Sequence, residues 1–281
     1  GVGLKVALAC HYRVAVGTAK GGLQEVLLGL LPGAGGTQRL PRITGPEKAL
    51  EMITSGRHIS AAEAKSCGLV DAVIDGDLKA GAIGFAEKMV AAKAPLRKVR
   101  DLDEKVQGVD AGIFAAARKE LNKSKRGFLA PQKCVDAVEA ACTLPFDEGM
   151  KRERELFTEL VTSDQSAAQR HIFFSERAAA KVNDMPKDVR VMDVKLGAVL
   201  GAGTMGGGIA MNFANAGVKT YIFEVNQEAL DRGMETIKKN YASTVKKGRL
   251  SQGEMDKRLE LIIPTLSYDD FKDADFIIEA V

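Results

Sequence analysis

A glycine-rich turn constrains the fold of this chain more than any other feature. Residues 201–206 read Gly-Ala-Gly-Thr-Met-Gly, a G-x-G-x-x-G pattern that directly follows an apolar segment predicted as a strand, 195–200. A predicted helix follows at 209–216, and a second predicted strand at 218–223. A strand, a helix and a strand in this order form a parallel β-α-β unit, with the glycines at the carboxyl end of the first strand.

Each residue type in the turn suits a dinucleotide. Gly201 permits the tight turn, Gly203 allows a pyrophosphate to approach the backbone, and Gly206 lets the helix pack closely on the strand. The amides near Thr204 and Met205 begin a helix, whose positive end favours a phosphate. These five residues are therefore the predicted cofactor-binding residues of the turn.

An acidic residue completes the pattern. Glu224 follows the second predicted strand and lies 23 residues after Gly201, close to the spacing of about 20 that dinucleotide-binding domains show. Its carboxylate can accept both ribose hydroxyls and repels a 2′-phosphate, so the prediction is NAD rather than NADP. The alternative is a glycine-rich turn in an α/β domain without a cofactor.

The rest of this segment continues the α/β pattern. Asn226 is the predicted N-cap of a helix from 227 to about 247, and further strands are predicted at 261–265 and 276–281. Pro264 suits an edge strand or a strand end. No histidine for hydride-transfer chemistry can be placed here, because all of them precede this segment: His11, His58 and His171.

Composition limits the class of protein. The 281 residues suggest roughly two domains, and a hydrophobic fraction of 46% with 27% charged residues is typical of a globular chain. A net charge of +3 does not indicate a nucleic-acid partner. The sequence has no apolar run of membrane-spanning length, about 18 residues or more. The four cysteines form no C-x-x-C pair, so no metal site or disulfide framework is expected.

The two stretches before the turn differ in their predicted secondary structure. Residues 1–95 alternate predicted helices with short predicted strands, which indicates an α/β fold. The helices are predicted at 4–10, 45–55 and after a capping box of Ser60 and Glu63, and the strands at 12–16 and 69–74. Residues 96–190 are predicted as mostly helical, with helices at 114–121 and 133–141, a long amphipathic segment at 148–182 that carries His171, and a linker at 187–190. His171 is interpreted as a packed or surface histidine.

Residues 21–42, GGLQEVLLGLLPGAGGTQRLPR, resemble the motif of the crotonase (enoyl-CoA hydratase/isomerase) superfamily. Supporting matches lie at 3–10 and at 54–70. Residues 191–281 resemble the NAD-binding half of L-3-hydroxyacyl-CoA dehydrogenases. This order of domains resembles the multifunctional enzymes of fatty-acid β-oxidation, in particular the peroxisomal-type bifunctional proteins. The expected architecture is therefore α/β: the C-terminal part of a crotonase-like domain in 1–95, a helical segment in 96–190 and a partial Rossmann-type domain in 191–281.

The resemblance implies roles for three residues of the first stretch. Crotonase-type hydratases use two glutamates to add water to an enoyl thioester, and backbone amides stabilise the thioester enolate. The second family glutamate falls on Glu25, the predicted catalytic residue. One of the enolate-stabilising amides falls on Val2, the predicted substrate-binding residue. The first family glutamate falls on Lys5, whose ammonium cannot act as a carboxylate base, so hydration is in doubt.

Three functions remain open. The first is a bifunctional enzyme that hydrates or isomerises enoyl-CoA and oxidises 3-hydroxyacyl-CoA with NAD. The second is an enoyl-CoA isomerase that uses Glu25 alone, and the third is a catalytically incomplete NAD-binding module. The expected ligands are acyl-CoA thioesters and NAD, in the cytoplasm of a bacterium or the peroxisome of a eukaryote. The family's other domain parts do not occur in the sequence, so an internal fragment is expected, and its oligomeric state is not predicted.

Overall fold

The computed structural model describes residues 1–186 and 188–281 and divides into two compact units. The first unit is Gly1–Asn183 and the second is Asp184–Val281. Within the described residues, no helix has both the length and the apolar character that crossing a membrane requires. Of the linker predicted at 187–190, Lys187 lies outside the described residues. The predicted domain boundaries at 95 and 190 stay predictions.

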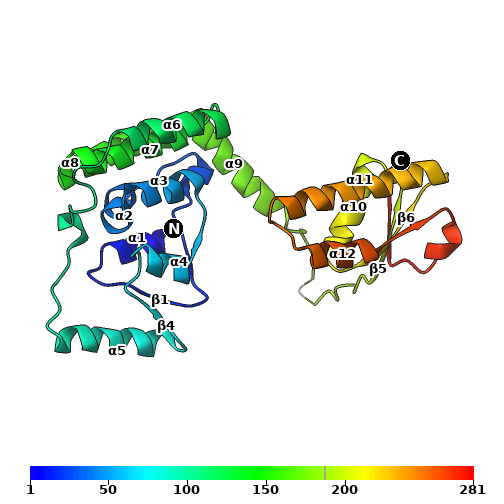
Figure 1. Ribbon diagram of the computed structural model, residues 1–281, viewed down its shortest axis with the longest axis horizontal. Helices are drawn as coiled ribbons and strands as arrows, with labels where there is room; N and C mark the ends of the chain where they lie inside the picture. Colours follow the sequence, from blue (N-terminus) through cyan, green and yellow to red (C-terminus); the bar gives the residue numbers. More distant parts are fainter. Residues whose placement is uncertain (187) are drawn as a thin grey trace. The chain divides into compact units, whose positions relative to one another are not determined.

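The first unit begins with short helices and strands and continues with longer helices (Figure 1). Its first elements are α1 (Val2–Leu8), β1 (Val14–Val16), β2 (Lys20–Gly21), the 3₁₀ helix η1 (Glu25–Leu28), α2 (Gly36–Thr44), α3 (Pro46–Ser55), β3 (Ile59–Ser60), α4 (Ala61–Ser66) and β4 (Ala72–Ile74). The later elements are α5 (Leu78–Ala91), the 3₁₀ helix η2 (Val99–Asp101), α6 (Gly112–Ser124), α7 (Leu129–Thr143), α8 (Phe146–Val161) and α9 (Asp164–Ala179).

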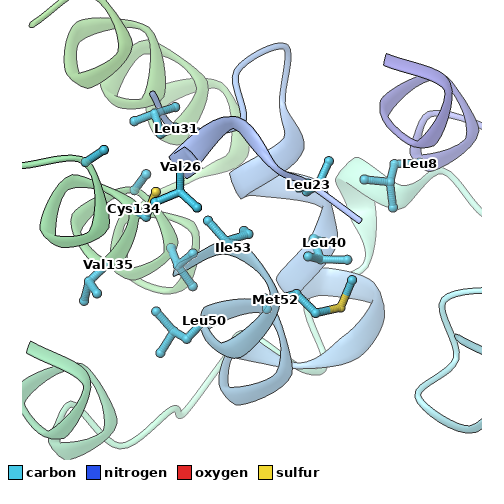
Figure 2. Close-up of a cluster of buried hydrophobic side chains, with 14 of the residues drawn as sticks. Leu8, Leu23, Val26, Leu31, Leu40, Leu50, Met52, Ile53, Cys134 and Val135 are labelled. Atoms are coloured by element: carbon cyan, nitrogen blue, oxygen red, sulfur yellow. The ribbon is translucent and has the colours of Figure 1, made fainter. Parts of the chain in front are cut away.

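The core of this unit joins the first stretch of the sequence to the helical segment. Figure 2 shows Leu40 of α2 and Ile53 of α3 beside η1 and the helix that carries Cys134. Leu40, Ile53 and Cys134 are fully buried. The apolar residues of α3 recur at helical spacing, as predicted, so one face of this helix is buried by α2 and α7. In Figure 1, α6, α7 and α8 lie as a layer over α2 and α3.

Several predicted bounds in this unit are wrong. The first helix begins at Val2 rather than residue 4 and ends at Leu8. The predicted strands are shorter than expected, although Asp71 still donates its backbone N–H to the carbonyl of Arg13 at 2.6 Å. Arg13 donates its backbone N–H to Asp71 Oδ2 at 2.7 Å and its Nε to the carbonyl of Leu69 at 2.7 Å. Only Val14–Val16 and Ala72–Ile74 remain as a parallel pair of strands.

The segment 148–182, predicted as long and amphipathic, consists of two helices. α8 ends at Val161, and Ser163 caps α9 by accepting the N–H of Ser166 at 3.2 Å. The turn lets the fully buried Ser166 donate its hydroxyl to the carbonyl of Leu28 at 2.9 Å. A serine whose hydroxyl bonds a nearby backbone group, as Ser163 does, disfavours continuation of a helix. The contact between Ser166 and Leu28 also favours the break.

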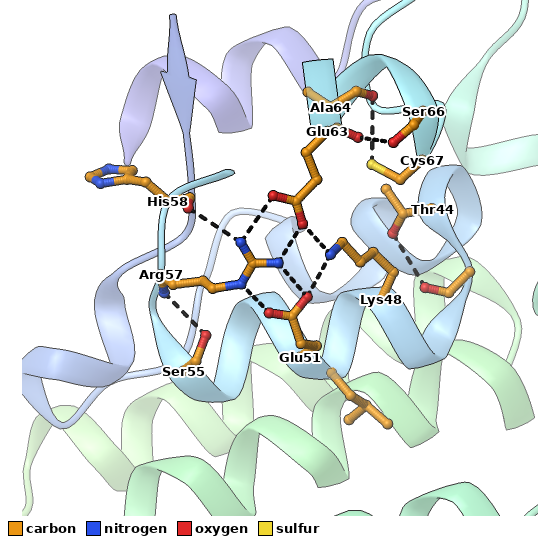
Figure 3. Close-up of polar contacts among 12 residues, drawn as sticks. Thr44, Lys48, Glu51, Ser55, Arg57, His58, Glu63, Ala64, Ser66 and Cys67 are labelled. Carbon is orange, nitrogen blue, oxygen red and sulfur yellow. Dashed lines mark hydrogen bonds and ion pairs between the residues drawn. The ribbon is translucent and has the colours of Figure 1, made fainter. Parts of the chain in front are cut away.

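The capping box predicted at Ser60 and Glu63 forms only in part. Ser60 accepts the N–H of Glu63, but the carboxylate of Glu63 turns to Lys48 and Arg57 instead of the N-cap backbone (Figure 3). Arg57 also pairs with Glu51, so two cations and two carboxylates join α3 to α4. Hydrogen bonds from Arg57 and Lys48 lower the pKa of Glu63 to about 2. The bonds from Lys48 and Arg57 join two ionised groups, whereas the box would join the carboxylate to a neutral amide, so the two cations bind Glu63 in preference to the Ser60 N–H.

A buried carboxylate of α8, Glu153, caps the N-terminal end of α2, although the two helices are far apart in the sequence. Glu153, 2% exposed, accepts the N–H of Gly35 at 2.7 Å and that of Thr37 at 3.1 Å, and also bonds the Thr37 hydroxyl. The first amides of a helix have no partner within it, and α2 has no side-chain cap of its own at Gly35. Burial raises the pKa of Glu153, while the bonds from Thr37 and Gly35 act in the opposite direction.

The second unit is a four-stranded parallel sheet with helices between its strands. Its elements are β5 (Leu196–Leu200), α10 (Thr204–Asn215), β6 (Lys219–Phe223), α11 (Gln227–Lys246), α12 (Gln252–Glu260), β7 (Ile262–Thr265), the 3₁₀ helix η3 (Tyr268–Phe271) and β8 (Phe276–Glu279). The strand order is β7-β6-β5-β8, so Pro264 lies on an edge strand, as predicted. Asn226 caps α11 by accepting the N–H of Ala229 at 2.9 Å, which is also as predicted.

The helix α12 was not predicted, although its sequence carries a capping box. Ser251 accepts the N–H of Glu254, and the Glu254 carboxylate accepts the N–H of Ser251. The pattern S-x-x-E is a recognised start signal for a helix, and it identifies this one.

We predict that Glu153→Gln destabilises the first unit by about 1–3 kcal/mol, because a glutamine amide cannot accept from both Gly35 and Thr37 and leaves a buried donor unpaired. A raised folded-state pKa means that the Glu153 contribution is largest below the unfolded pKa and falls as the pH rises through the folded one. Urea unfolding followed by circular dichroism measures the difference in the free energy of unfolding between the two proteins.

Glu155→Gln is the matched control, because this carboxylate lies on the same helix and forms only an exposed pair with Arg152. Hydrogen exchange over residues 33–44 should accelerate in Glu153→Gln and stay unchanged in Glu155→Gln. Equal protection of residues 33–44 in both variants would contradict the capping role.

Candidate functional site

The glycine turn of the second unit lies at the carboxyl end of the central strand β5, as predicted. Gly201 has φ +100°, and a Cβ there would lie 2.7 Å from the carbonyl oxygen of Ala280. A Cβ at Gly206 would lie 1.8 Å from the carbonyl oxygen of Gly201. Both glycines are therefore required by the packing of the protein itself.

Gly203 is different. It has an ordinary negative φ of −67°, and a Cβ built there meets nothing within 4 Å. Neither backbone strain nor internal packing explains a glycine at this position. The open space above it is what a ligand that approaches the backbone needs, so the turn fits a bound pyrophosphate.

The start of α10 faces the same space. Gly203 is its N-cap, and within the described part of the chain no side chain caps this end. Thr204 and Met205 are its first two residues, and the Met205 side chain is 72% exposed. Uncapped amides with the positive end of a helix dipole favour an anion.

Glu224 lies beside the turn, directly after β6. Its Oε1 accepts the N–H of Ala202 at 2.8 Å, so the carboxylate joins the end of β6 to the glycine turn. In the strand order β7-β6-β5-β8, the chain leaves β5 toward β6 and later returns to the opposite side of β5 as β8. Ligands of open α/β sheets bind at such a reversal, outside the carboxyl ends of the strands.

In the first unit, the residue predicted as catalytic is paired with the residue that departs from the family. Lys5 Nζ lies 3.1 Å from Glu25 Oε1, and each side chain is 17% exposed. The other carboxylate oxygen of Glu25, Oε2, is buried without a hydrogen-bond partner among the described residues. The structure therefore brings together Lys5, which lies on α1, and Glu25, which lies on η1.

Lys5 also lines a cleft of about 280 Å³. The other lining residues come from the glycine-rich turn before α2 and from α8: Gly33, Ala34, Met150, Glu153, Arg154 and Phe157. The α8 residues of this cleft were not predicted, since no local pattern indicates which early segment that helix covers. Within the turn, Ala34 at φ +55° and Gly35 at φ +79° both have left-handed backbone conformations.

Val2 lies in the first turn of α1, and its side chain is 74% exposed. The N-cap of this helix is Gly1, which has no side chain to bond the first amides. Among the described residues the backbone of Val2 is thus at the helix end that the predicted role needs, although that role stays a prediction. His171 lies exposed on α9 with Nε2 3.3 Å from the Ser175 hydroxyl, which agrees with a surface histidine.

Two family models match the chain. Residues 1–107 match "Enoyl-CoA hydratase/isomerase", and residues 197–281 match "3-hydroxyacyl-CoA dehydrogenase, NAD binding domain". The cofactor predicted from the glycine turn and Glu224 is therefore confirmed as NAD, and the predicted α/β architecture is confirmed as a crotonase-like domain followed by a Rossmann-type domain.

Curated relatives match over the whole chain. A peroxisomal bifunctional enzyme of Danio rerio is 41% identical, and the match covers 100% of this chain and 39% of the relative. The peroxisomal bifunctional enzyme of Homo sapiens is 37% identical with the same coverage of both chains. The peroxisomal fatty acid beta-oxidation multifunctional protein MFP2 of Arabidopsis thaliana is 35% identical, again over 100% and 39%.

The chain thus spans 39% of the length of these relatives. The order of its two matched segments is the order expected from the sequence. Residues 1–107 are thus similar to the enoyl-CoA hydratase/isomerase family, and residues 197–281 are similar to the NAD-binding domain of the 3-hydroxyacyl-CoA dehydrogenase family.

Proposed function

We propose that this chain supplies the cofactor-binding part of an NAD-dependent 3-hydroxyacyl-CoA dehydrogenase and the thioester-binding part of an enoyl-CoA hydratase or isomerase. The observation that supports the dehydrogenase part of this proposal is Gly203, a glycine that neither packing nor backbone conformation requires. The names of the relatives, which are bifunctional or multifunctional β-oxidation proteins, support the pairing of the two activities.

In this proposal each residue of the turn has one task. Gly203 admits the pyrophosphate, and the amides near Thr204 and Met205 bind it at the start of α10. Gly201 and Gly206 keep the turn tight against β8 and within α10. NAD, when bound, supplies the hydride acceptor for oxidation of a 3-hydroxyacyl thioester.

Glu224 selects the cofactor. Its carboxylate lies at the end of β6, where it can accept the hydroxyls of the adenosine ribose. The same negative charge repels the 2′-phosphate of NADP at short range. The hydrogen bond to Ala202 N–H holds the carboxylate at the edge of the turn before the ribose arrives.

In the first unit, we propose that the Val2 amide stabilises the thioester enolate and that Glu25 moves the proton. Hydration in this family needs a second carboxylate, and the Lys5 ammonium stands in its position, 3.1 Å from Glu25. This pair favours the second candidate function, in which Glu25 alone shifts the double bond of an enoyl-CoA. A cofactor-binding module without chemistry is the third candidate. It is excluded if the protein that carries this chain turns over 3-hydroxyacyl-CoA.

The proposed ligands are acyl-CoA thioesters and NAD. The relatives are named as peroxisomal, so a peroxisomal location is proposed for a eukaryotic source and a cytoplasmic one for a bacterial source. An oligomeric state is not part of the proposal.

We predict that Gly203→Val weakens NAD binding by at least about tenfold, because its side chain occupies the space of the pyrophosphate. Gly208→Val is the control: position 208 lies on the same helix, is exposed and has no neighbour within 4 Å of a Cβ. Calorimetric titration with NAD measures both. Equal affinities for the two variants would contradict the assignment of the pyrophosphate site.

We predict that Glu224→Gln narrows the preference for NAD over NADP, by about tenfold in the ratio of the two dissociation constants. Glutamine keeps an acceptor for the Ala202 N–H but removes the charge that opposes a 2′-phosphate. Glu228→Gln, which removes an exposed charge paired with Arg232 on α11, should leave the ratio unchanged. A ratio that stays constant in Glu224→Gln would show that another group selects the cofactor.

We predict that Lys5→Glu, in the protein that carries this chain, raises the hydration rate of crotonyl-CoA by about 100-fold, because it places a second carboxylate beside Glu25. Lys5→Gln removes the ion pair without supplying a base, so its rate should stay at the starting level. The absorbance of the conjugated thioester follows the reaction. A rate that Lys5→Glu leaves unchanged would count against the two-carboxylate account.

A further inference from the structure

A second cleft of the first unit has a volume of about 460 Å³, and five of its eleven lining residues are basic. It lies between the C-terminal part of α2, the turn after α4 and the segment 97–105. Two carboxylates line it, Asp71 and Glu104, against five basic residues: Arg13, Arg42, Lys65, Arg97 and Lys105. None of these residues belongs to the cleft of Lys5 or to the glycine turn.

Arg42 has too few partners for a buried cation. Its side chain is 2% exposed, and of its five N–H donors Nη1 bonds the carbonyl of Gln38 at 2.8 Å. Its Nε has no hydrogen-bond partner among the residues that the structure describes, because Asp103 Oδ1 lies 3.6 Å away. The face of the Phe146 ring lies 5.1 Å from the guanidinium carbon. A buried charge that lacks hydrogen bonds is costly.

The other two arginines share one carboxylate. Arg97 pairs with Asp71 Oδ1, while the Nη2 atom of Arg13 lies 4.0 Å from Asp71 Oδ2. Arg13 is nearly as buried as Arg42, with a side chain 5% exposed, and the Nε of Arg97 is buried without a hydrogen-bond partner within the described ranges. Burial lowers the pKa of both Arg13 and Arg42, although carboxylates act against the shift. The cluster therefore holds more cationic donors than its own acceptors satisfy.

Lys105 extends the same face. Its ammonium donates to the carbonyl of Ile43 at 2.6 Å, at the C-terminal end of α2. An ammonium has three donors, so others remain available. Guanidinium and ammonium groups that converge on one cleft match the geometry of a tetrahedral oxyanion, which accepts several charge-assisted hydrogen bonds at once.

We propose that this cleft binds an oxyanion of the phosphate class through Arg42, Arg97 and Lys105. Inorganic phosphate and the phosphate monoester of a larger molecule share this chemistry. The proposal does not depend on the NAD site or on the chemistry at Glu25.

The test is a titration of the protein with sodium phosphate, with sodium chloride at equal ionic strength as the reference. Saturating NAD is present throughout, so that the glycine turn is not available to phosphate. ¹⁵N-resolved NMR reports the site directly, through the Nε–H signals of Arg42 and Arg97 and the amide of Gly68, which also lines the cleft. These signals should shift with phosphate and not with chloride.

Arg97→Gln and Lys105→Gln should each weaken phosphate binding by about tenfold. Lys98→Gln is the matched control, since Lys98 is an exposed neighbour of Arg97 that does not line the cleft. Arg97 also anchors Asp71, so circular dichroism must show an unchanged fold, and Lys105→Gln decides the test if Arg97→Gln unfolds.

Adenosine 3′-monophosphate distinguishes the two sources of phosphate. Binding tighter than that of inorganic phosphate supports a monoester ligand, and equal or weaker binding supports free phosphate. Signals that fail to shift below about 10 mM phosphate would overturn the site, as would an affinity that Lys105→Gln leaves unchanged.

Discussion

The first unit depends on one buried carboxylate that joins segments far apart in the sequence. Glu153 of α8 accepts the amides of Gly35 and Thr37, and thereby completes the N-terminal end of α2. Three hydrogen bonds, one of them from a hydroxyl, offset part of the cost of burying this charge. The same contact fixes the turn that holds Gly33 and Ala34, which line the cleft beside Lys5. The helical segment thus lines the cleft beside Lys5 and also covers the core.

The second unit depends on a different constraint, the close approach of backbone to backbone. Gly201 and Gly206 are required because a Cβ at either position would overlap a carbonyl oxygen. Gly203 has no such neighbour among the described residues, so the packing of the protein does not require a glycine there. The hydrogen bond from the Ala202 N–H to Glu224 joins the turn to the end of β6.

The Lys5–Glu25 pair sets the charge at one position of the first unit. Lys5 Nζ lies 3.1 Å from Glu25 Oε1, so the ammonium and the carboxylate neutralise each other. In the proposed function, proton transfer by Glu25 is therefore the chemistry left to this position. The basic cleft around Arg42 is different, because its cationic donors outnumber its acceptors.

The sequence by itself determined the features that depend on neighbouring residues. The glycine turn between a strand and a helix, the Asn226 cap and the helix of 46–55 were all predictable, because local spacing specifies them. The Ser251–Glu254 box carried an equally local signal for α12. The motif around Glu25 and Lys5 likewise indicated the family and the departure from it.

Only the tertiary structure decided the contacts between distant segments. The break between α8 and α9 follows from the bond of Ser166 to Leu28, and the partial capping box at Ser60 follows from the pairing of Glu63 with Lys48 and Arg57. Glu153 reaches a turn 118 residues away, which no local pattern indicates. Burial explains the contacts of Ser166 and Glu153, because a buried polar group without a partner is costly. At the partly exposed Glu63, ion pairs with Lys48 and Arg57 outweigh the local cap.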